Sequence, residues 1–255
     1  MARIEFPNPL LADPEGLLAG GGDLAPDTLI TAYSQGIFPW FNPGQPILWW
    51  SPDPRLVLYP ERFKCSRSLR RVIKSATHQV TANREFTQVV RACATRGLSA
   101  ALTLDTASIA SLDTTERSGE PATWITADMQ SAYQTLHTMG VAHSVEVWEN
   151  GRLTGGLYGL KLGNAFFGES MFSIASNASK VALAYLVCWA KRVGVVLIDC
   201  QVTSPHLLSL GAIEVDRGVF LAQVKEHIND PSPEEKIVFQ NEFAKMQAVD
   251  VIKNV

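Results

Sequence analysis

The chain has 255 residues, of which 46% are hydrophobic and 18% charged, so it has enough apolar material for one large domain or two modest ones. Its formal net charge of −3 gives no overall attraction to nucleic acid, and any contact with RNA must therefore come from a local basic patch. The four cysteines form no CxxC pair, which argues against a zinc site or a disulfide framework and predicts reduced thiols.

Residues 1–54 differ in composition from the rest of the chain. They are rich in Pro and Gly, and they carry three of the six tryptophans, Trp40, Trp49 and Trp50. The segment APDTLITAYSQG predicts one short helix that ends at Gly36, and the remainder predicts ordered loop. Tryptophans in such a loop either pack on a larger unit, which is the commoner case, or stack on nucleic-acid bases. We therefore predict a small aromatic N-terminal domain, 1–54, that covers a larger domain, 55–255.

Past this region, strand and helix patterns alternate. RLVLY and HQVTA predict strands, while SRSLRRVIK (66–74) and REFTQVVRACATR (84–96) predict helices. Residues 97–122 are rich in Ser, Thr and Ala and have no sustained period, which predicts a surface insertion. A third helix is expected from Thr126 to Gly140.

The second half of the chain predicts the centre of a sheet. Asn150 and Gly151, set between HSVEVW and RLTGGLYG, are typical of a tight hairpin turn, and the strand FFGESMFS follows. NASKVALAYLVCWAKRVG (177–194) is apolar almost all round and predicts a buried helix that ends at Gly194. VVLIDCQV (195–202) predicts a strand covered on both faces, and SPEE predicts a capping box that opens a terminal helix. Together these patterns predict an α/β fold with a mixed, mainly antiparallel sheet.

Polar side chains within these apolar strands are candidates for chemistry. In LIDCQV, alternation places Asp199 and Gln201 on one face, where they either bind a ligand at the end of the strand or only cap the next loop. In FFGESMFS, alternation places Phe167, Glu169 and Met171 together. A buried carboxylate needs a partner, so Glu169 either pairs with a buried Arg or Lys or forms half of a binding site. If the two strands share a sheet, we expect a pocket for a ligand with one cationic and one apolar part.

A basic run, KCSRSLRRVIK, precedes the strand HQVTA. Four of its five basic side chains share a face at helical spacing. Such a run is usually only a solvated face, but in an acidic chain it is also a candidate patch for nucleic-acid phosphates. Its basic members are Lys64, Arg67, Arg70, Arg71 and Lys74.

Several common motifs are missing from the sequence. It has no GxxxxGK[ST] loop, which argues against a nucleoside triphosphatase, and no HExxH or similar cluster, which argues against a catalytic metal. The five histidines are scattered and there is no G-x-S-x-G elbow, so hydrolysis by a standard nucleophile is not expected. The sequence opens without a signal-peptide core and has no apolar run of about 18 residues, so we expect a cytoplasmic protein without a membrane span.

The order of several long motifs resembles the bacterial leucyl/phenylalanyl-tRNA–protein transferases. The motifs are GIFPWF, ILWWSPDPR, TWIT…AY, HSVEVW, FFGESMFS…NASK and LIDCQV. The resemblance implies a small N-terminal domain joined to a larger domain of GNAT-like fold. The implied activity moves Leu or Phe, and Met weakly, from aminoacyl-tRNA to the α-amine of a protein that begins with Arg or Lys, which creates an N-degron.

The implied reaction requires no cofactor. Aminolysis of an ester by an amine is downhill, so neither ATP nor a metal is expected. GNAT enzymes that use acetyl-CoA hold its pyrophosphate with a glycine-rich loop at a helix N-terminus. Here the corresponding loop, MFSIASNASK, has no glycine, which favours a tRNA donor over CoA and gives the basic run a purpose.

The resemblance also implies roles for individual residues. Gln201 would hydrogen-bond the attacking amine and Asp199 would polarise Gln201, so this pair is the expected catalytic group. Glu169 and Asp199 would face the cationic acceptor, because carboxylates offset its desolvation. The aminoacyl group and the terminal adenosine of the donor are expected at Tyr33, Trp40, Trp124, Tyr133, Met171, Phe172 and Ser173.

Two rival functions stay open at this point. The first is another GNAT-like transferase that uses aminoacyl-tRNA but has a cell-wall precursor as acceptor, which would give Glu169 and Asp199 no shared purpose. The second is a non-catalytic tRNA-binding protein that uses the basic helix and the aromatic loop, which would give LIDCQV no purpose.

Overall fold

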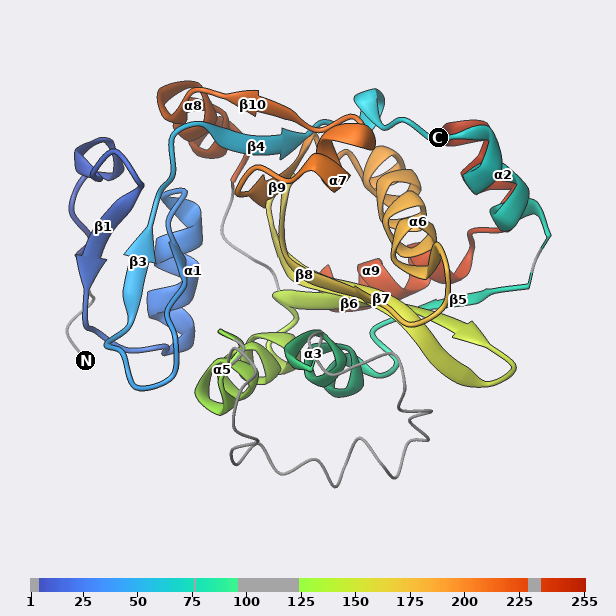
Figure 1. Ribbon diagram of the computed structural model, residues 1–255, viewed down its shortest axis with the longest axis horizontal. Coiled ribbons are helices and arrows are strands. Elements are labelled where there is room, and N and C mark those ends of the chain that lie inside the picture. The colour runs from blue at the N-terminus through green and yellow to red at the C-terminus, as the bar shows by residue number, and fades with distance from the viewer. Residues whose placement is uncertain (1–4, 76, 96–123, 229–234) are drawn as a thin grey trace.

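The computed structural model describes residues 5–75, 77–95, 124–228 and 235–255. The insertion expected at 97–122 lies outside the described residues, and so do residues 232–234 of the SPEE motif. Figure 1 shows the described chain as a large sheet with helices on both faces and a smaller sheet at one side.

The large sheet has seven strands in the described chain. In spatial order they are β10 (Ile213–Val215), β4 (Arg55–Leu58), β9 (Leu197–Gln201), β8 (Ala165–Ser173), β7 (Arg152–Leu162), β6 (Ala142–Glu149) and β5 (Gln79–Ala82). Neighbouring strands are antiparallel except for the parallel pair β8 and β9. The prediction of an α/β fold with a mixed, mainly antiparallel sheet is confirmed. The predicted hairpin turns at Asn150 and Gly151, whose φ angles of 52° and 75° suit a tight turn of this type.

Helices cover both faces of the large sheet (Figure 1). The helices on one face are α3 (Phe86–Ala94) and α5 (Ala127–Thr138). Those on the other face are α6 (Ala178–Val193), α2 (Arg67–Lys74), α9 (Glu235–Ala244) and α10 (Ala248–Asn254). The described chain also contains the helix α8 (Arg217–His227) and the short helix α7 (Pro205–Ser209), and two 3-10 helices, η1 (Pro9–Leu11) and η2 (Pro60–Arg62), lie earlier in the chain.

Local sequence explains where the main helices begin and end. Ser66 Oγ accepts a hydrogen bond from the Leu69 N–H at 3.1 Å, and Thr126 Oγ1 accepts one from the Met129 N–H at 3.3 Å. Both predicted helices therefore start at a hydroxyl cap. Helix α6 ends at Gly194, whose φ of 78° is easy only for glycine. Twelve of its 16 residues are buried, which confirms the prediction of a helix that is apolar almost all round.

The segment before β4 contains a second, smaller sheet. Its strands in spatial order are β1 (Leu17–Gly20), β3 (Leu48–Trp50) and β2 (Phe38–Pro39), and the helix of this region is α1 (Pro26–Ser34). The prediction that this region is loop apart from one helix is wrong, because strands of two to four residues are too short to show a period. Trp49 is buried and its Nε1 donates to the Gly21 carbonyl at 2.8 Å, so this tryptophan has a packing role. A domain boundary after residue 54 remains a proposal.

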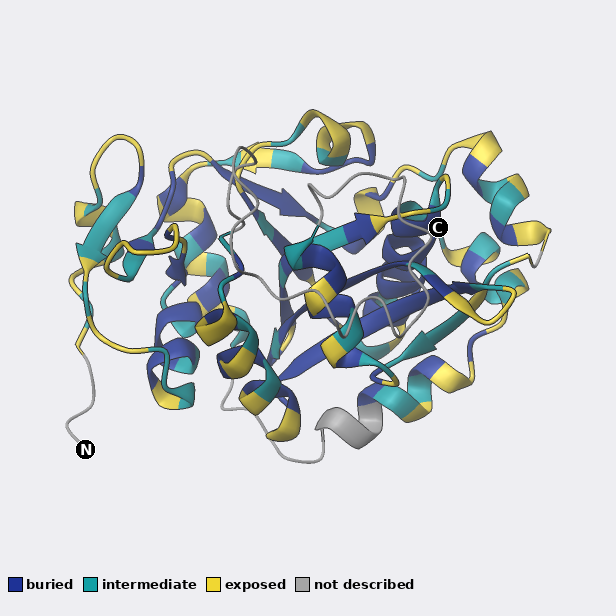
Figure 2. Cartoon of the chain, turned by 60° about the horizontal axis from the view of Figure 1, so that its bottom comes forward, coloured by how far each residue is buried: buried dark blue, intermediate teal, exposed yellow. Residues whose placement is uncertain are grey.

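Two hydrophobic cores lie on opposite faces of the large sheet. The first joins α1, α3 and α5 to sheet residues that include Tyr158, Phe167 and Phe172. The second surrounds α6. Because Leu197 belongs to the first core and Ile198 to the second, β9 is covered on both faces as predicted. Figure 2 shows the buried residues running through the strands at the centre, with exposed residues on the outer sides of the helices and in loops.

Candidate active site

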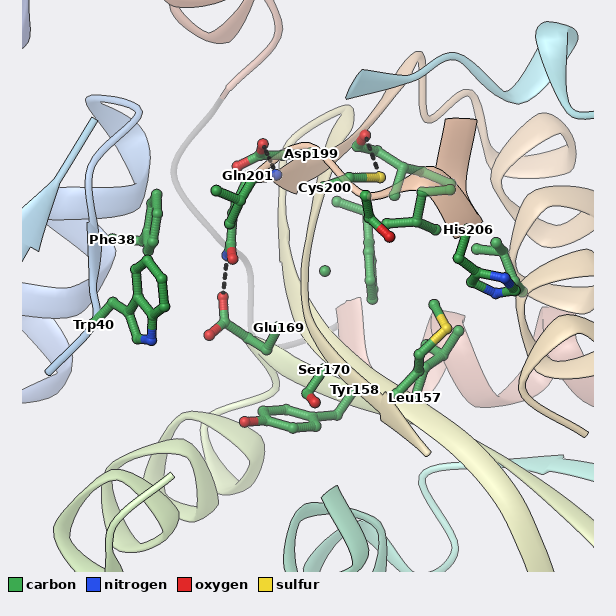
Figure 3. A pocket seen from close by; sticks show the side chains of 18 of the residues that line it. Phe38, Trp40, Leu157, Tyr158, Glu169, Ser170, Asp199, Cys200, Gln201 and His206 are labelled. Carbon is green, nitrogen blue, oxygen red and sulfur yellow. Dashed lines mark hydrogen bonds between the residues drawn. The ribbon is translucent and has the colours of Figure 1, made fainter. Parts of the chain in front are cut away.

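A pocket of about 420 Å³ lies where β7, β8, β9, α6 and α7 meet strand β2 of the small sheet. Figure 3 shows Glu169 and Gln201 pointing toward one another along one side of it, with Phe38 and Trp40 beside them. His206 lies on the opposite side (Figure 3). The volume falls within the roughly 300–1,000 Å³ that small-molecule sites usually have.

Glu169 enters the pocket from a bulge in β8. The register of β8 against β7 shifts between the pairs Ser170–Tyr158 and Gly168–Gly159, so Glu169 is the extra residue. A Cβ atom added at Gly168 would lie 3.4 Å from the carbonyl oxygen of the next strand, at Asp199. A side chain at position 168 would therefore touch β9 without a severe clash, at the point where both strands carry polar side chains.

The bulge corrects one prediction from the sequence. Simple alternation would put Phe167 on the same face as Met171, but the extra residue between them reverses the pattern. Phe166 lines the pocket together with Met171. Phe167 packs instead in the first core against Tyr33, with ring centroids 5.4 Å apart.

Three side chains donate hydrogen bonds to the Glu169 carboxylate. The Tyr33 hydroxyl donates to Oε1 at 2.7 Å, the Tyr133 hydroxyl to Oε2 at 2.6 Å, and Gln201 Nε2 to Oε1 at 2.9 Å. The two tyrosine hydroxyl oxygens are themselves 2.5 Å apart. Among the described residues, no Arg or Lys forms a salt bridge with Glu169. The alternative that a buried cation neutralises Glu169 is therefore wrong for the described chain.

The surroundings of Glu169 shift several pKa values. Burial raises the pKa of Glu169 from 4.5 to about 7, although the hydrogen bonds from Tyr133, Tyr33 and Gln201 oppose the shift and the charge of Asp199 adds to it. Burial and the nearby Glu169 carboxylate hold the pKa values of Tyr33 and Tyr133 well above their ordinary range. Both tyrosines therefore keep their protons and remain donors at neutral pH, while Glu169 exchanges its proton near pH 7.

Gln201 is held by its backbone as well as by its side chain. Its φ of 63° lies in the left-handed region, which is uncommon for a residue other than glycine. Asp199 Oδ1 accepts a hydrogen bond from the Gln201 N–H at 2.9 Å and so fixes this turn. Because Nε2 of Gln201 donates to Glu169, its Oε1 is left as an acceptor to which no described residue donates.

Asp199 is paired with a residue that sequence reasoning missed, Arg55. The Arg55 Nε donates to Oδ1 at 2.8 Å and Nη2 donates to Oδ2 at 2.7 Å, in a bidentate and fully buried pair. The guanidinium lies between the rings of Phe38 and Phe220, at 4.8 and 4.5 Å from their centroids. The available signal was a lone Arg at the start of the apolar strand RLVLY.

Family models match most of this chain. The model described as leucyl/phenylalanyl-tRNA protein transferase matches residues 57–103 and 100–225, and the model of its N-terminal domain matches residues 22–53. The chain belongs to the leucyl/phenylalanyl-tRNA–protein transferase family. The predicted resemblance is confirmed, and the chain is an aminoacyltransferase.

Curated relatives with the name leucyl/phenylalanyl-tRNA–protein transferase match nearly end to end. The one from Anaeromyxobacter dehalogenans (strain 2CP-C) is 49% identical over 227 residues, which cover 89% of each chain. The one from Nitrosospira multiformis is 50% identical over 232 residues, which cover 91% of each chain. The one from Azotobacter vinelandii is 50% identical over 222 residues, which cover 87% of this chain and 89% of the relative.

Among solved structures, a match is found to L-PGS from Bacillus licheniformis. It has a TM-score of 0.39 and 11% identity, and it covers 66% of this chain and 48% of that chain. So distant a likeness supports no conclusion about this chain, and the GNAT-like part of the fold prediction rests on the family alone.

The donor residues expected in this transferase family fall into two groups in the structure. Trp40 and Trp124 line the pocket, and Trp40 is 42% exposed at its edge. Tyr33 and Tyr133 are fully buried behind Glu169 and are not among the lining residues. The two tyrosines therefore do not contact the pocket directly; they act on it through Glu169, whose carboxylate accepts their hydrogen bonds.

The apolar wall of the pocket comes from β7, β8, α6 and β9. Its main members are Leu157, Phe166, Met171, Leu183, Leu186 and Ile198. The structure places the expected residue Met171 in this wall but not its neighbour Phe172, which is 4% exposed in the first core, because successive strand residues face opposite sides. Ser173 lies outside the lining as well, and its Oγ accepts from the Ser179 N–H at the start of α6 at 3.2 Å.

The predicted basic face is only partly available. The exposed members are Lys64, Arg67, Arg71 and Lys74. Arg70 is half-buried and donates to the Ile252 carbonyl at 2.8 Å and to the Val255 carbonyl. The structure thus assigns Arg70 to the contact between α2 and α10, in place of the phosphate contact that the sequence suggested.

The described residues contain no group of three His, Cys, Asp or Glu side chains placed to hold a metal ion. All four cysteines are free in the structure, and two of them, Cys93 and Cys188, are buried. Within the same residues, every helix is too short or too polar to cross a membrane.

Proposed function

We propose that this chain transfers Leu or Phe, and Met weakly, from aminoacyl-tRNA to the α-amino group of a protein that begins with Arg or Lys, in the cytoplasm. The product carries a new N-terminal residue that acts as an N-degron. The observation that carries this proposal is Glu169, a buried carboxylate without a cationic partner among the described residues, in the same pocket as an apolar wall. A site of this kind suits two substrates, one apolar and one cationic.

The aminoacyl group of the donor is assigned to the apolar wall. Leu183, Leu186 and Met171 offer only hydrocarbon and thioether surface, so they bind an unbranched or γ-branched apolar side chain without any polar group to discriminate among such side chains. A hydrophobic pocket separates side chains that differ by a methylene by only ~1–3 kcal/mol, which accounts for the acceptance of Leu, Phe and Met together. Trp40 and Trp124 are assigned to the terminal adenosine, on which they stack.

The acceptor is assigned to the Glu169 side of the pocket. Asp199 is already neutralised by its bidentate pair with Arg55, so Glu169 is the carboxylate left to meet the positive charge of the acceptor. Asp199 contributes by position, because it fixes the backbone of Gln201 through the Gln201 N–H. Gln201 in turn offers Oε1 as an acceptor for an N–H of the attacking amine.

The proposed reaction is aminolysis of an ester. The acceptor α-ammonium first loses one proton, and its nitrogen lone pair then attacks the carbonyl carbon of the aminoacyl ester. The C–N bond forms, the C–O bond to the ribose breaks, and a second proton passes from the nitrogen to the leaving ribose oxygen. Much of the rate comes from holding the amine and the ester at attack distance.

Label transfer from leucyl-tRNA to matched peptides tests this function. The peptides begin with Arg, Lys, Ala or acetyl-Arg and are otherwise identical. We expect label on the free Arg and Lys N-termini alone, since transfer requires both a cationic side chain and a free amine. Label on a cell-wall precursor but on no peptide would favour the rival transferase, and binding of tRNA without any transfer would favour a binding protein.

A further inference from the structure

Glu169 forms a closed ring of contacts with two tyrosines. Its Oε1 lies 2.7 Å from the Tyr33 hydroxyl, the two tyrosine hydroxyls are 2.5 Å apart, and the Tyr133 hydroxyl lies 2.6 Å from Oε2. The three side chains come from β8, α1 and α5, and none is more than 8% exposed. The ring is therefore sealed by packing, with the pocket at its Glu169 end.

The number of protons in this ring depends on Glu169. Each tyrosine carries one hydroxyl proton. When Glu169 is ionised, both protons point at the carboxylate, and the 2.5 Å contact between the two hydroxyls has none. When Glu169 is protonated on Oε2, it donates to Tyr133, Tyr133 donates to Tyr33, and Tyr33 donates to Oε1. All three contacts then become hydrogen bonds, so the ring can accommodate Glu169 with or without a proton.

We propose that Glu169 accepts the proton that the acceptor α-ammonium must lose, and that Tyr33 and Tyr133 are positioning residues that hold its carboxylate in place for this transfer. The proposal rests on the proposed function. In the balanced step, one N–H bond of the ammonium breaks and an O–H bond forms on Glu169. The amine nitrogen then attacks the ester, its second proton leaves with the ribose oxygen, and Glu169 returns its proton to solvent after the product departs.

Asp199 and Tyr158 are two further ionisable groups in the pocket lining that act on Glu169, whereas His206 lies on the opposite side of the pocket (Figure 3). Asp199, on β9, accepts hydrogen bonds on both oxygens from Arg55 of β4 and also from the Gln201 N–H. Tyr158, on β7, keeps its own proton because burial holds its pKa well above the ordinary range. Gln201 does not titrate. Burial raises the pKa of Glu169 to about 7, which is close to the ordinary pKa of an α-amine, about 7.7–8.0. Groups with similar pKa values exchange a proton readily, so Glu169 is suited to take the proton of the acceptor ammonium.

The variant Glu169→Gln separates proton transfer from binding. An amide has the size of the protonated carboxyl group and can donate to Tyr133 in its place, so the ring stays filled and the fold is kept. With saturating leucyl-tRNA and saturating Arg peptide, we expect kcat at neutral pH to fall by roughly 10²–10⁴-fold. The loss should shrink as the pH rises past about 8, because the amine then arrives already deprotonated. If Glu169→Gln raises only the KM for the peptide and leaves kcat unchanged, the proposal is overturned.

Tyr33→Phe and Tyr133→Phe test the ring itself. Each change removes a donor to the carboxylate, so the pKa of Glu169 should rise and the acidic limb of the pH–rate profile should move to higher pH. Tyr59→Phe is a matched control, because it removes a tyrosine hydroxyl that bonds Gln223 outside the ring. An acidic limb that stays in place in both ring variants would contradict the inference.

A spectroscopic readout makes the inference independent of transfer activity. The carboxyl carbon of Glu169 can be followed by NMR against pH in protein with labelled glutamate, and its signal is assigned by its loss in Glu169→Gln. Its midpoint should lie near 7 in the wild type and higher in Tyr133→Phe. Glu146→Gln assigns a second buried carboxylate, bonded to Ser144 and Thr81, whose titration should not move in Tyr133→Phe. If the wild type transfers no label, the proposed function fails, whereas a Glu169 midpoint that ignores the tyrosines overturns the ring alone.

Discussion

Gln201 donates from Nε2 to Oε1 of Glu169 at 2.9 Å, and this hydrogen bond joins the two strands that carry the polar side of the pocket. The strands are β8 and β9, the one parallel pair in the described sheet. Glu169 sits at a bulge in β8, and the register of β9 against β4 also shifts just before Gln201. The two side chains thus meet at a point where both neighbouring strands are irregular.

Glu169→Gln should stabilise the protein above neutral pH. The folded pKa of about 7 exceeds the ordinary 4.5, so between these values the folded chain keeps a proton that the unfolded chain has released, and the stability of the wild type falls as the pH rises. The full effect is on the order of 3 kcal/mol. Thermal unfolding at pH values below and above this window should show Tm of the variant gaining on that of the wild type. Glu15→Gln, at an exposed position, is the control and should show no such gain.

Arg55 and Asp199 should behave as one unit in a double-mutant cycle. Arg55→Met or Asp199→Asn alone leaves one partner of a buried pair without the other, at a cost of about 3–5 kcal/mol in stability. The double variant removes both charges and should recover much of that stability. Its kcat should nevertheless stay as low as that of the slower single variant, because Gln201 has lost its anchor.

The control for this cycle is another buried arginine. Arg217 donates to the carbonyls of Pro9 and Ala12, away from the pocket lining. Arg217→Met should lower Tm and leave kcat of the folded protein unchanged. If the rate losses of Arg55→Met and Asp199→Asn instead multiply in the double variant, the two residues act independently.

The exposed part of the basic face should bind tRNA, and Arg70 should not. Charge reversal at Arg71 and Lys74 should weaken tRNA binding and flatten its dependence on salt, because each lost phosphate contact reduces the slope of log K against log salt by roughly 0.7–0.9. Arg70→Gln should leave the slope unchanged and lower Tm, since this side chain bonds α10. A slope that responds to Arg70 and ignores Arg71 and Lys74 would reverse this assignment.

Leu186→Ala should shift the choice of donor toward the larger side chain. Leu186 is 1% exposed in the protein core and lines the apolar wall, so its truncation enlarges the pocket. The ratio of kcat/KM for phenylalanyl-tRNA over leucyl-tRNA should rise by roughly 10-fold or more, in line with ~1–3 kcal/mol per methylene. Leu136→Ala removes a fully buried leucine of α5 outside the lining and should lower Tm without changing the ratio. Equal ratios in both variants would argue against the assignment of this wall to the aminoacyl group.

Local patterns in the sequence were sufficient for most of the elements. The hydroxyl caps at Ser66 and Thr126, the turn at Asn150 and Gly151 and the glycine at the end of α6 all act within a few residues, so the sequence states them directly. The short strands of the small sheet escaped prediction because two to four residues are too few to show a period. Long motifs also identified the family and brought Glu169 and Gln201 forward as site residues.

Only the tertiary structure decided which partners the site residues have. Arg55 and Asp199 are 144 positions apart, and Tyr33 and Tyr133 are 100 positions apart, so no local pattern links them. The bulge in β8 directs Phe167 into the first core. Arg70 donates a hydrogen bond to α10, a helix near the end of the described chain. By itself the sequence determined which side chains are available for chemistry, because residue type sets what can be charged, donated or accepted. The packing of distant segments decided which of them meet, and therefore which carboxylate pairs with Arg55 and which has no cationic partner among the described residues.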